Sequence, residues 1–245
     1  MYFNLKVIMS SAYFDFKKFR VYHDCSSMKV GTDGVLLGSW ADIDRCKNIL
    51  DIGTGSGLIA LMVAQRNTQA SVYGVDIDVD STIQAQENVE ASPFSQRIKI
   101  VQCDIKHWNP DVAFDAILSN PPFYEEDLLP PNAVRSKARH TQAGGLTLEE
   151  LVVNVSRLLK KGGVFTVVLP HSIAQKFEGI CCSYRLYLRR RTDVITSLGK
   201  MPKRCLLEFR KEEDFGGLMV DTLVLADKSG QRSSGYQELT KEFYL

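Results

Sequence analysis

From residue 47 onward, short apolar runs alternate along the chain with segments that carry the apolar stripe of an amphipathic helix. Strands that alternate with helices build a mostly parallel sheet covered by helices on both faces. The last part of the chain has strands with less room for helices between them, which favours an antiparallel edge. The alternation therefore predicts an α/β fold with a seven-stranded, mostly parallel sheet. Strands are expected over residues 47–52, 72–75, 98–102, 114–118, 164–169, 205–209 and 219–225, and helices over 58–65, 78–91, 146–159 and 233–243.

The first predicted strand ends in Asp-Ile-Gly-Thr-Gly-Ser-Gly, which places Asp51 ahead of Gly53, Gly55 and Gly57. Glycines let a backbone approach a ligand closely, and ligands of open α/β sheets bind at the carboxyl ends of the strands. The spacing differs from the G-x-G-x-x-G fingerprint of dinucleotide-binding proteins. A carboxylate here would repel a pyrophosphate but suits a ligand with an amine or a sulfonium. The loop therefore favours S-adenosylmethionine over NAD, while a tight strand-to-helix turn by itself also needs glycine.

Two further acids follow the second and third predicted strands. Asp76 lies 19 residues after Gly57, where a carboxylate can accept hydrogen bonds from both hydroxyls of a ribose. Asp104 follows strand 98–102 and is placed to accept from the amino group of an adenine. Each acid has a simpler interpretation, Asp76 as a helix cap and Asp104 as a turn acid. The shared placement of three acids at strand ends favours a cofactor site.

The fourth predicted strand ends in Ser-Asn-Pro-Pro-Phe-Tyr, residues 119–124. Neither proline can continue a helix or donate to a sheet ladder, so the strand ends in a rigid turn. An exocyclic amine on a base is a poor nucleophile, because its lone pair is delocalised into the ring. The Asn120 side-chain oxygen and the Pro121 carbonyl can accept its two N–H hydrogens, in a geometry that Pro122 stiffens.

Two aromatic residues complete this turn. Phe123 can stack on a planar base that has left its helix, and Tyr124 can share that role or line the pocket. A methyl donor then needs only in-line placement, so no general base is required. A rigid turn alone is the simpler interpretation, but the glycine loop and the strand-end acids favour catalysis. The expected catalytic residues are Asn120, Pro121, Pro122 and Phe123.

Together these motifs resemble the Rossmann-like, S-adenosylmethionine-dependent methyltransferases that modify amino nitrogens. The resemblance covers residues 47–170 and implies the class I methyltransferase fold with S-adenosylmethionine as cofactor. It leaves the substrate open, because enzymes that act on adenine, cytosine, guanine and protein glutamine share the tetrapeptide pattern. The similarity rests on the loop at 51–57, on Asp76 and Asp104, and on Asn-Pro-Pro-Phe at 120–123.

The N-terminal segment narrows the choice. Residues 14–40 are similar to the bacterial tRNA1(Val) adenine-N6 methyltransferases, and this resemblance runs the length of the chain. It implies methyl transfer to N6 of adenine 37, 3′ of the anticodon in valine tRNA. Phe123 departs from the tyrosine that is more frequent in that family, but it retains the ring. We expect residues 1–46 to form an extension that covers the cofactor, followed by the methyltransferase domain over 47–245, in a single globular unit.

Within that extension, residues 29–38 are expected to fold over the cofactor. Thr32 or Asp33 is expected to cap a helix that starts at Gly34. A capped helix that only packs against the sheet is the simpler interpretation, and both can hold together. The expected cofactor contacts are Lys29, Thr32, Asp51, Gly53, Gly55, Gly57, Asp76, Asp104 and Asn120.

Charge is unevenly distributed along the chain, although the formal net charge is only +1. Residues 1–128 carry 11 Lys and Arg against 17 Asp and Glu, whereas residues 129–210 carry 15 against 5. Such a basic segment suits a polyanion, and nucleic acid is the commonest one; a solvated basic surface is the alternative. The residues expected to contact RNA are Tyr124, Arg135, Lys137, Arg139 and His140 in or beside a candidate lid over 125–146, and Arg189, Arg190, Arg191, Lys203 and Arg204 in a second group.

Three other functions stay open at this point. A guanine-N2 methyltransferase of ribosomal RNA is the nearest rival, because Asn-Pro-Pro-Phe is frequent there, although such chains are often duplicated and longer. A glutamine methyltransferase of release factors carries a separate helical N-terminal domain, for which the 46 residues before the first strand are too few. That target also leaves the basic segment unexplained. A non-catalytic RNA-binding scaffold would need neither Asp51 nor Asn120.

The cysteine pattern indicates whether the protein resides in a reducing or an oxidising cellular compartment. Six cysteines are scattered along the chain without a C-x-x-C pair, which favours free thiols over a disulfide framework or a zinc site. No apolar run approaches the roughly 20 residues that span a bilayer, and the N-terminus lacks the design of a signal peptide. We therefore expect a cytoplasmic enzyme with no metal, no membrane contact and no obligatory protein partner, whose substrate is the anticodon arm of valine tRNA.

Overall fold

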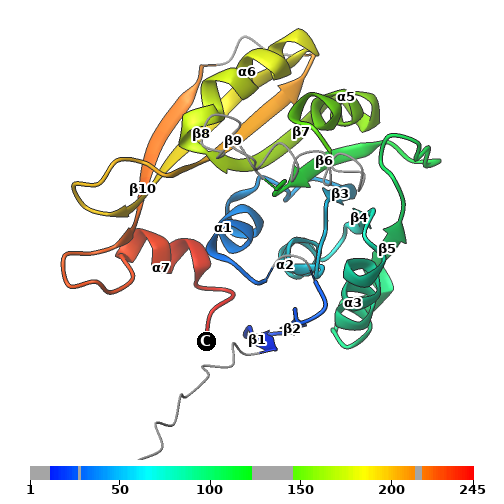
Figure 1. Cartoon of the computed structure of the whole chain (residues 1–245), viewed down its shortest axis with the longest axis horizontal. Helices are drawn as coiled ribbons and strands as arrows, with labels where there is room; N and C mark the ends of the chain where they lie inside the picture. The colour runs from blue at the N-terminus through cyan, green and yellow to red at the C-terminus, as the bar shows by residue number, and fades with distance from the viewer. Residues whose placement is uncertain (1–11, 27–28, 123–145, 213–216) are drawn as a thin grey trace, which may run out of the picture.

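The computed structural model describes residues 12–26, 29–122, 146–212 and 217–245. These residues are built round one large sheet with helices on both faces (Figure 1). The helices are α1 (Thr32–Trp40), α2 (Leu58–Arg66), α3 (Val79–Glu90), α5 (Leu148–Leu158), α6 (Ala174–Ser183) and α7 (Ser234–Thr240). The strands are β1 (Tyr13–Asp15), β2 (Arg20–Tyr22), β3 (Asn48–Ile52), β4 (Ser71–Asp76), β5 (Ile98–Gln102), β6 (Phe114–Ser119), β7 (Leu159–Pro170), β8 (Leu186–Ser197), β9 (Arg204–Lys211) and β10 (Met219–Ala226).

Eight of the strands form the large sheet, in the order β10-β8-β9-β7-β6-β3-β4-β5, and β1 and β2 form a separate antiparallel pair. All neighbouring strands from β5 to β7 run parallel. β9 is antiparallel to both β7 and β8, while β10 is parallel to β8. The prediction of an α/β fold with a mostly parallel sheet is therefore confirmed.

Two details of the predicted sheet are wrong. Among the described residues the sheet has eight strands instead of seven, because the sequence pattern does not predict β8. Its sequence, Leu-Tyr-Leu-Arg-Arg-Arg-Thr-Asp-Val-Ile-Thr-Ser, interrupts the apolar pattern with charged residues that are only partly buried. The antiparallel strand also lies inside the sheet, between β7 and β8, and not at its edge.

A hydrophobic core lies on each face of the sheet. Because successive residues of a strand point to opposite faces, Ile49 of β3 packs in one core and Leu50 in the other. Residues of α1, α2 and α7 fill the first core, and residues of α5 and α6 fill the second. Phe16 and Phe19 of the N-terminal segment also belong to the first core, with their rings stacked 4.7 Å apart.

The helix expected over 146–159 is α5, which begins two residues later, at Leu148, with Thr147 as its N-cap. The side chain of Thr147 accepts from the backbone N–H of Glu150, and the Glu150 carboxylate accepts in turn from the N–H of Thr147. This reciprocal capping box satisfies two of the free backbone donors at the start of α5.

The predicted cap of the first helix is wrong. The helix begins at Thr32 rather than Gly34, and its N-cap residue is Gly31, which has no side chain to cap it. Asp33 lies in the first turn and its carboxylate accepts from Arg204 Nε at 2.8 Å. An acid in the first turn is still favourable, because it faces the positive end of the helix dipole.

No helix among the described residues is long and apolar enough to cross a membrane. All six cysteines fall within the described ranges, and each is a free thiol. Within those same ranges, no group of three or more His, Cys, Asp or Glu side chains is arranged to hold a metal ion.

Candidate active site

The candidate site lies at the carboxyl edge of the parallel strands. Strand pairing sets Ile52 opposite Val75 and Ser119, and Asp76 opposite Gln102. The glycine loop, Asp76, Asp104 and Asn120 therefore leave the sheet at nearly one level. The parallel register thus brings together side chains that are up to 69 residues apart in the sequence, from Asp51 to Asn120.

The glycine loop has the backbone that its sequence predicts. Gly53, Gly55 and Gly57 have φ values of +72°, +54° and +82°, in the left-handed region that other residues rarely adopt. The backbone N–H groups of Gly53 and Thr54 donate to Val75 O at 2.9 and 3.0 Å, which ties the loop to β4. The loop is thus a fixed strand-to-helix turn whose backbone is open to a ligand.

Asp51 is a buried acid at the end of β3, with 1% of its surface exposed. Thr54 Oγ1 donates to its Oδ2 at 2.6 Å, while its Oδ1 has no hydrogen-bond partner among the described residues. Burial raises the pKa of Asp51 to about 7; the hydrogen bond from Thr54 opposes this rise and the charge of Asp76 adds to it. A buried carboxylate with a spare acceptor favours a cationic ligand, which would stabilise the ionised form.

Asp76 is held by two backbone donors. Its Oδ2 accepts from Gly55 N at 2.9 Å, and its Oδ1 accepts from Asp78 N at 3.0 Å. Asp78, and not Asp76, caps α3, by accepting from Ser81 N. The carboxylate of Asp76 is therefore fixed at the strand end, and each oxygen keeps a lone pair for a hydroxyl donor.

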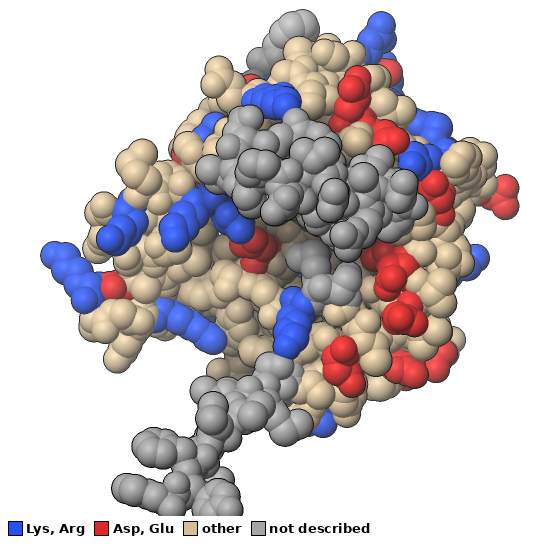
Figure 2. Space-filling view, in the orientation of Figure 1, with Lys and Arg blue, Asp and Glu red and all other residues tan. Residues whose placement is uncertain are grey.

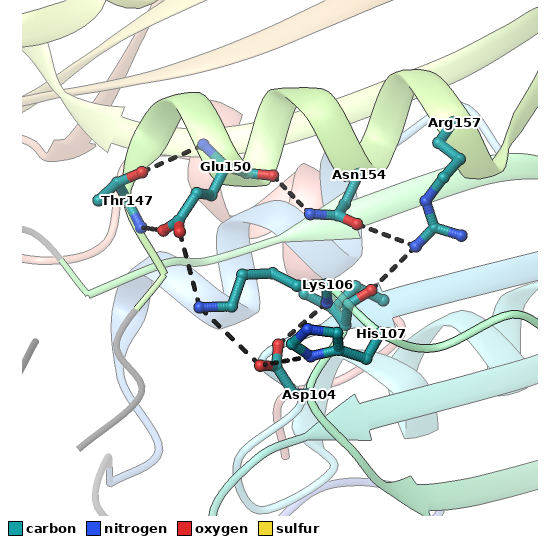
Figure 3. Close-up of polar contacts among 8 residues, drawn as sticks. Asp104, Lys106, His107, Thr147, Glu150, Asn154 and Arg157 are labelled. Carbon is teal, nitrogen blue, oxygen red and sulfur yellow. Dashed lines mark hydrogen bonds and ion pairs between the residues drawn. The ribbon is translucent and has the colours of Figure 1, made fainter. Parts of the chain in front are cut away.

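Asp104 follows β5 and forms a polar network with its own loop and with α5 (Figure 3). Its Oδ1 accepts from Lys106 N at 2.9 Å, and its Oδ2 lies 3.2 Å from His107 Nδ1. The Lys106 ammonium lies 3.8 Å from Asp104 and 3.6 Å from Glu150 at the start of α5. By its contacts Asp104 is thus a turn acid, and its hydrogen bond to an adenine amino group remains a prediction. No sequence pattern predicted that Lys106 and Glu150 would be its neighbours.

Asn120 follows β6, whose last residue is anchored by Ser119 Oγ donating to Ile52 O at 2.9 Å. The Asn120 side-chain oxygen is buried and has no partner among the described residues. Pro121 is buried and Pro122 is exposed, so the turn is packed on one side only. A buried acceptor without a partner costs free energy, and a substrate that donates to it recovers that cost.

Several expected contacts lie outside the described residues: Phe123, Tyr124, Arg135, Lys137, Arg139 and His140. Lys29 and Thr32 are described, and both are exposed just before and at the start of α1. Their contact with a cofactor remains a prediction.

The second group of expected RNA contacts includes three arginines of β8, and these do not all point to the same face of the sheet. Arg189, Arg190 and Arg191 are consecutive in β8, and successive residues of a strand point to opposite faces. A β-bulge at Arg189 disturbs this alternation, because pairing to β9 shifts between Leu188 and Arg190. The three arginines therefore do not form one continuous basic patch.

Two of these arginines are engaged with acids of the fold. Arg190 Nη2 donates to Glu208 Oε2 and to Trp40 O, both at 2.8 Å, and its guanidinium lies 3.6 Å from the centre of the Trp40 ring. Arg191 Nε donates to Asp193 at 2.8 Å, and its Nη2 lies 2.9 Å from His171 Nε2. The charge of both side chains is already balanced by an acid of the fold, so both are weaker phosphate ligands than an unpaired arginine.

We expect an Arg190→Ala variant to lose about 3 kcal/mol of unfolding free energy, because it leaves the buried Glu208 carboxylate without its partner. Urea denaturation followed by circular dichroism measures this loss. Lys200→Ala, at an exposed position, is the control and should unfold like the wild type. Equal stability of the Arg190→Ala variant and the wild type would contradict the structural role of this arginine.

Sequence reasoning missed a set of amide contacts that hold the N-terminal segment against the glycine loop. Asn88 exchanges two hydrogen bonds with the backbone of Tyr22, and its Nδ2 also donates to Ser56 O at 2.9 Å. Gln84, one helical turn earlier, accepts from Ser26 N at 2.8 Å. Two amides at i and i+4 on one face of a helix were the signal available in the sequence.

Comparisons with known proteins agree with this geometry. A family model described as the methyltransferase small domain matches residues 27–178. A tRNA1(Val) (adenine(37)-N6)-methyltransferase from Phocaeicola vulgatus is 45% identical over 237 residues, which cover 97% of this chain and 99% of that protein. A protein of the same name from Haemophilus influenzae is 40% identical over 235 residues, with 95% and 98% covered.

Among solved structures, a predicted O-methyltransferase from Agrobacterium tumefaciens matches with a TM-score of 0.69 at 20% identity, covering 86% of this chain and 96% of that one. At this identity the likeness concerns the fold alone, which is that of class I methyltransferases. The chain therefore belongs to the methyltransferase small domain family, in the group of the tRNA1(Val) (adenine(37)-N6)-methyltransferases.

Proposed function

We propose that this protein transfers a methyl group from S-adenosylmethionine to the N6 amino nitrogen of adenine 37 in valine tRNA, in the cytoplasm. The observation that carries the proposal is the buried side-chain oxygen of Asn120, which has no partner among the described residues and lies at the same sheet edge as the glycine loop and Asp76. Full-length similarity to proteins named for this reaction supports the choice of substrate.

The residues present fit S-adenosylmethionine. Asp51 Oδ1, which no described residue contacts by a hydrogen bond, suits a ligand that carries positive charge, and the left-handed glycines leave the backbone open to close approach. Asp76 would hold the ribose and Asp104 the adenine amino group, with Lys29, just before α1, and Thr32, at its start, covering the site. When bound, the cofactor supplies the electrophilic methyl group on its sulfonium.

Asn120 and Pro121 would act on the other reactant, the target adenine. The two carbonyl oxygens would accept both hydrogens of the exocyclic amine, so that its lone pair is released from the ring. The nitrogen would then bond to the methyl carbon as the carbon–sulfur bond breaks, S-adenosylhomocysteine would leave, and one amine proton would pass to solvent. Because no general base is needed, the protein contributes preorganised acceptors and position. The target base must leave its stack to reach this buried acceptor.

The distribution of charge supports a nucleic-acid substrate. In Figure 2, Lys and Arg side chains gather mainly on the side of β8, β9 and α7, whereas Asp and Glu gather on the side of α3. RNA that approaches the carboxyl edge from the basic side keeps its phosphates away from the acidic side. A glutamine side chain as target gives no reason for this division.

The proposal is tested by methyl transfer from labelled S-adenosylmethionine to total tRNA from a strain that lacks this gene. The product nucleoside is identified by mass spectrometry. We expect N6-methyladenosine in valine tRNA and no label in other tRNAs. N2-methylguanosine in ribosomal RNA, or label only in protein, would overturn the substrate while leaving a methyltransferase.

A further inference from the structure

The loop that joins β8 to β9 carries exposed apolar side chains beside unpaired positive charges. We call residues 198–203 the hairpin tip; their sequence is Leu-Gly-Lys-Met-Pro-Lys. Met201 is 80% exposed, the most exposed large apolar side chain but one among the described residues, and Leu198 is 56% exposed. Lys200 and Lys203 are exposed and form no ion pair with any described residue.

This pattern contrasts with the arginines nearby. Arg190, Arg191 and Arg204 each contact an acid within 2.8 Å. The two lysines of the hairpin tip are therefore the cations of this region with the most charge available to a partner. An exposed methionine between two lysines suits a partner that offers both phosphates and apolar ring faces.

The hairpin tip is held firmly at its base. Gly199 has φ +81°, which allows the tight turn, and Lys200 N donates to Ser197 O at 3.2 Å. Lys203 N donates to Val194 O, and Lys203 O accepts from His171 N, both at 3.1 Å. The exposed side chains are thus presented on a preorganised turn that is tied to the end of β7.

Strand pairing places the hairpin tip on the same edge of the sheet as Asn120. Ser119 pairs with Val167 in β7, and Pro170, three residues further on, pairs with Arg204 at the base of the tip. At about 3.3 Å per residue along the strands, the tip begins about 10 Å beyond the end of β6. It is also displaced across the sheet by two strand spacings, which is again about 10 Å. The tip lies at the periphery of the molecule (Figure 1).

We propose that the hairpin tip is an RNA-binding element, in which Met201 and Leu198 pack against unstacked bases next to the target adenine while Lys200 and Lys203 neutralise phosphates. The inference rests on the proposed function, since it assigns a further surface for the same substrate. A base that leaves its stack exposes the faces of its neighbours, and an apolar wedge replaces the lost stacking. The lysines supply the salt-dependent part of the affinity.

Two sets of variants test the inference, each with a matched control. Met201→Ala is compared with Met219→Ala, because Met219 is 63% exposed but starts β10 opposite Arg190, at the other end of β8. Lys200→Gln combined with Lys203→Gln is compared with Lys99→Gln, on the exposed face of β5. All four proteins should keep the wild-type melting temperature and the wild-type affinity for S-adenosylmethionine, since the changed side chains are exposed.

The readouts are tRNA affinity at several salt concentrations, kcat/KM for valine tRNA, and the fluorescence of 2-aminopurine placed beside adenine 37. We expect the Met201→Ala variant to lose roughly tenfold in kcat/KM and most of the fluorescence rise that reports unstacking. The double lysine variant should bind tRNA more weakly, with a salt slope lower by about 1.5. Both controls should match the wild type.

The outcomes separate this inference from the proposed function. If the wild type methylates adenine 37 and both hairpin variants match their controls, the hairpin tip does not bind RNA and the proposed function stands. If the wild type leaves tRNA unmethylated, the proposed substrate is wrong, and the tRNA affinities of the variants still decide whether the tip binds RNA.

Discussion

An Asn120→Ala variant is expected to transfer methyl groups about three orders of magnitude more slowly than the wild type while binding S-adenosylmethionine nearly as well. The substitution removes the buried oxygen that has no partner among the described residues and that we assign to one N–H of the target amine. Without this acceptor, the amine lone pair stays delocalised into the purine ring. The loss therefore falls on kcat, because the interaction matters most as the nitrogen becomes nucleophilic.

Single-turnover kinetics with valine tRNA and calorimetric titration of the cofactor measure the two quantities separately. Asn109→Ala is the control, because Asn109 is an exposed amide in the loop after β5, bonded to Arg157 and not placed at the carboxyl edge. Its activity should stay within about twofold of the wild type. Activity of the Asn120→Ala variant within a few-fold of the wild type would show that the chemistry does not depend on this acceptor.

The sequence predicted the carboxyl edge well, because every part of it follows a strand. Each of Asp51, Asp76 and Asn120 stands at or directly after an apolar run, and parallel pairing puts the ends of such runs at one level. Short-range patterns and one general rule of sheet topology were sufficient there. The left-handed backbone of the glycine loop was predictable for the same reason, since glycine is the residue that adopts it without strain.

The sequence could not predict contacts made between distant segments. Arg204 pairs with Asp33, 171 residues earlier, and Arg190 pairs with Glu208 and stacks on Trp40. A run of three arginines suggests one basic surface. Because the run lies in a strand, however, its side chains point to different faces of the sheet. Because side chains alternate along a strand, Arg190 and Arg191 face acids of β8 and β9. Both arginines therefore form ion pairs within the fold.

The same limit applies to the energetics of Asp51. Its place before the glycines was evident, but its burial depends on β4 and β6, which flank it in the sheet with Gly74 and Leu118 opposite it. Burial is what raises its pKa from 3.8 to about 7. The consequence for stability and binding follows from that shift, and it is the second large effect that we expect.

We compare the free energy of unfolding of the wild type with that of an Asp51→Asn variant. The wild-type value minus the variant value should decrease by about 4 kcal/mol as the pH rises from 4 to 7. The folded protein keeps a proton on Asp51 over this range, whereas the unfolded chain releases it near pH 3.8. The folded state therefore binds more protons, and its stability falls by about 1.4 kcal/mol per pH unit until the carboxyl ionises near 7. Below pH 4 and above pH 7 the difference between the two proteins should be constant.

Urea denaturation of both proteins across this pH range measures the difference, and groups shared by the two proteins cancel. A difference that does not change with pH would mean that Asp51 ionises with an ordinary pKa in the fold. Binding provides an independent check, because a cationic ligand favours the ionised carboxylate. The affinity of the wild type for S-adenosylmethionine should therefore increase between pH 6 and 8 relative to that of the Asp51→Asn variant. Near neutral pH, the buried Asp51 thus destabilises the protein that has no cofactor bound. A positively charged cofactor bound beside Asp51 stabilises its ionised form and so opposes that effect.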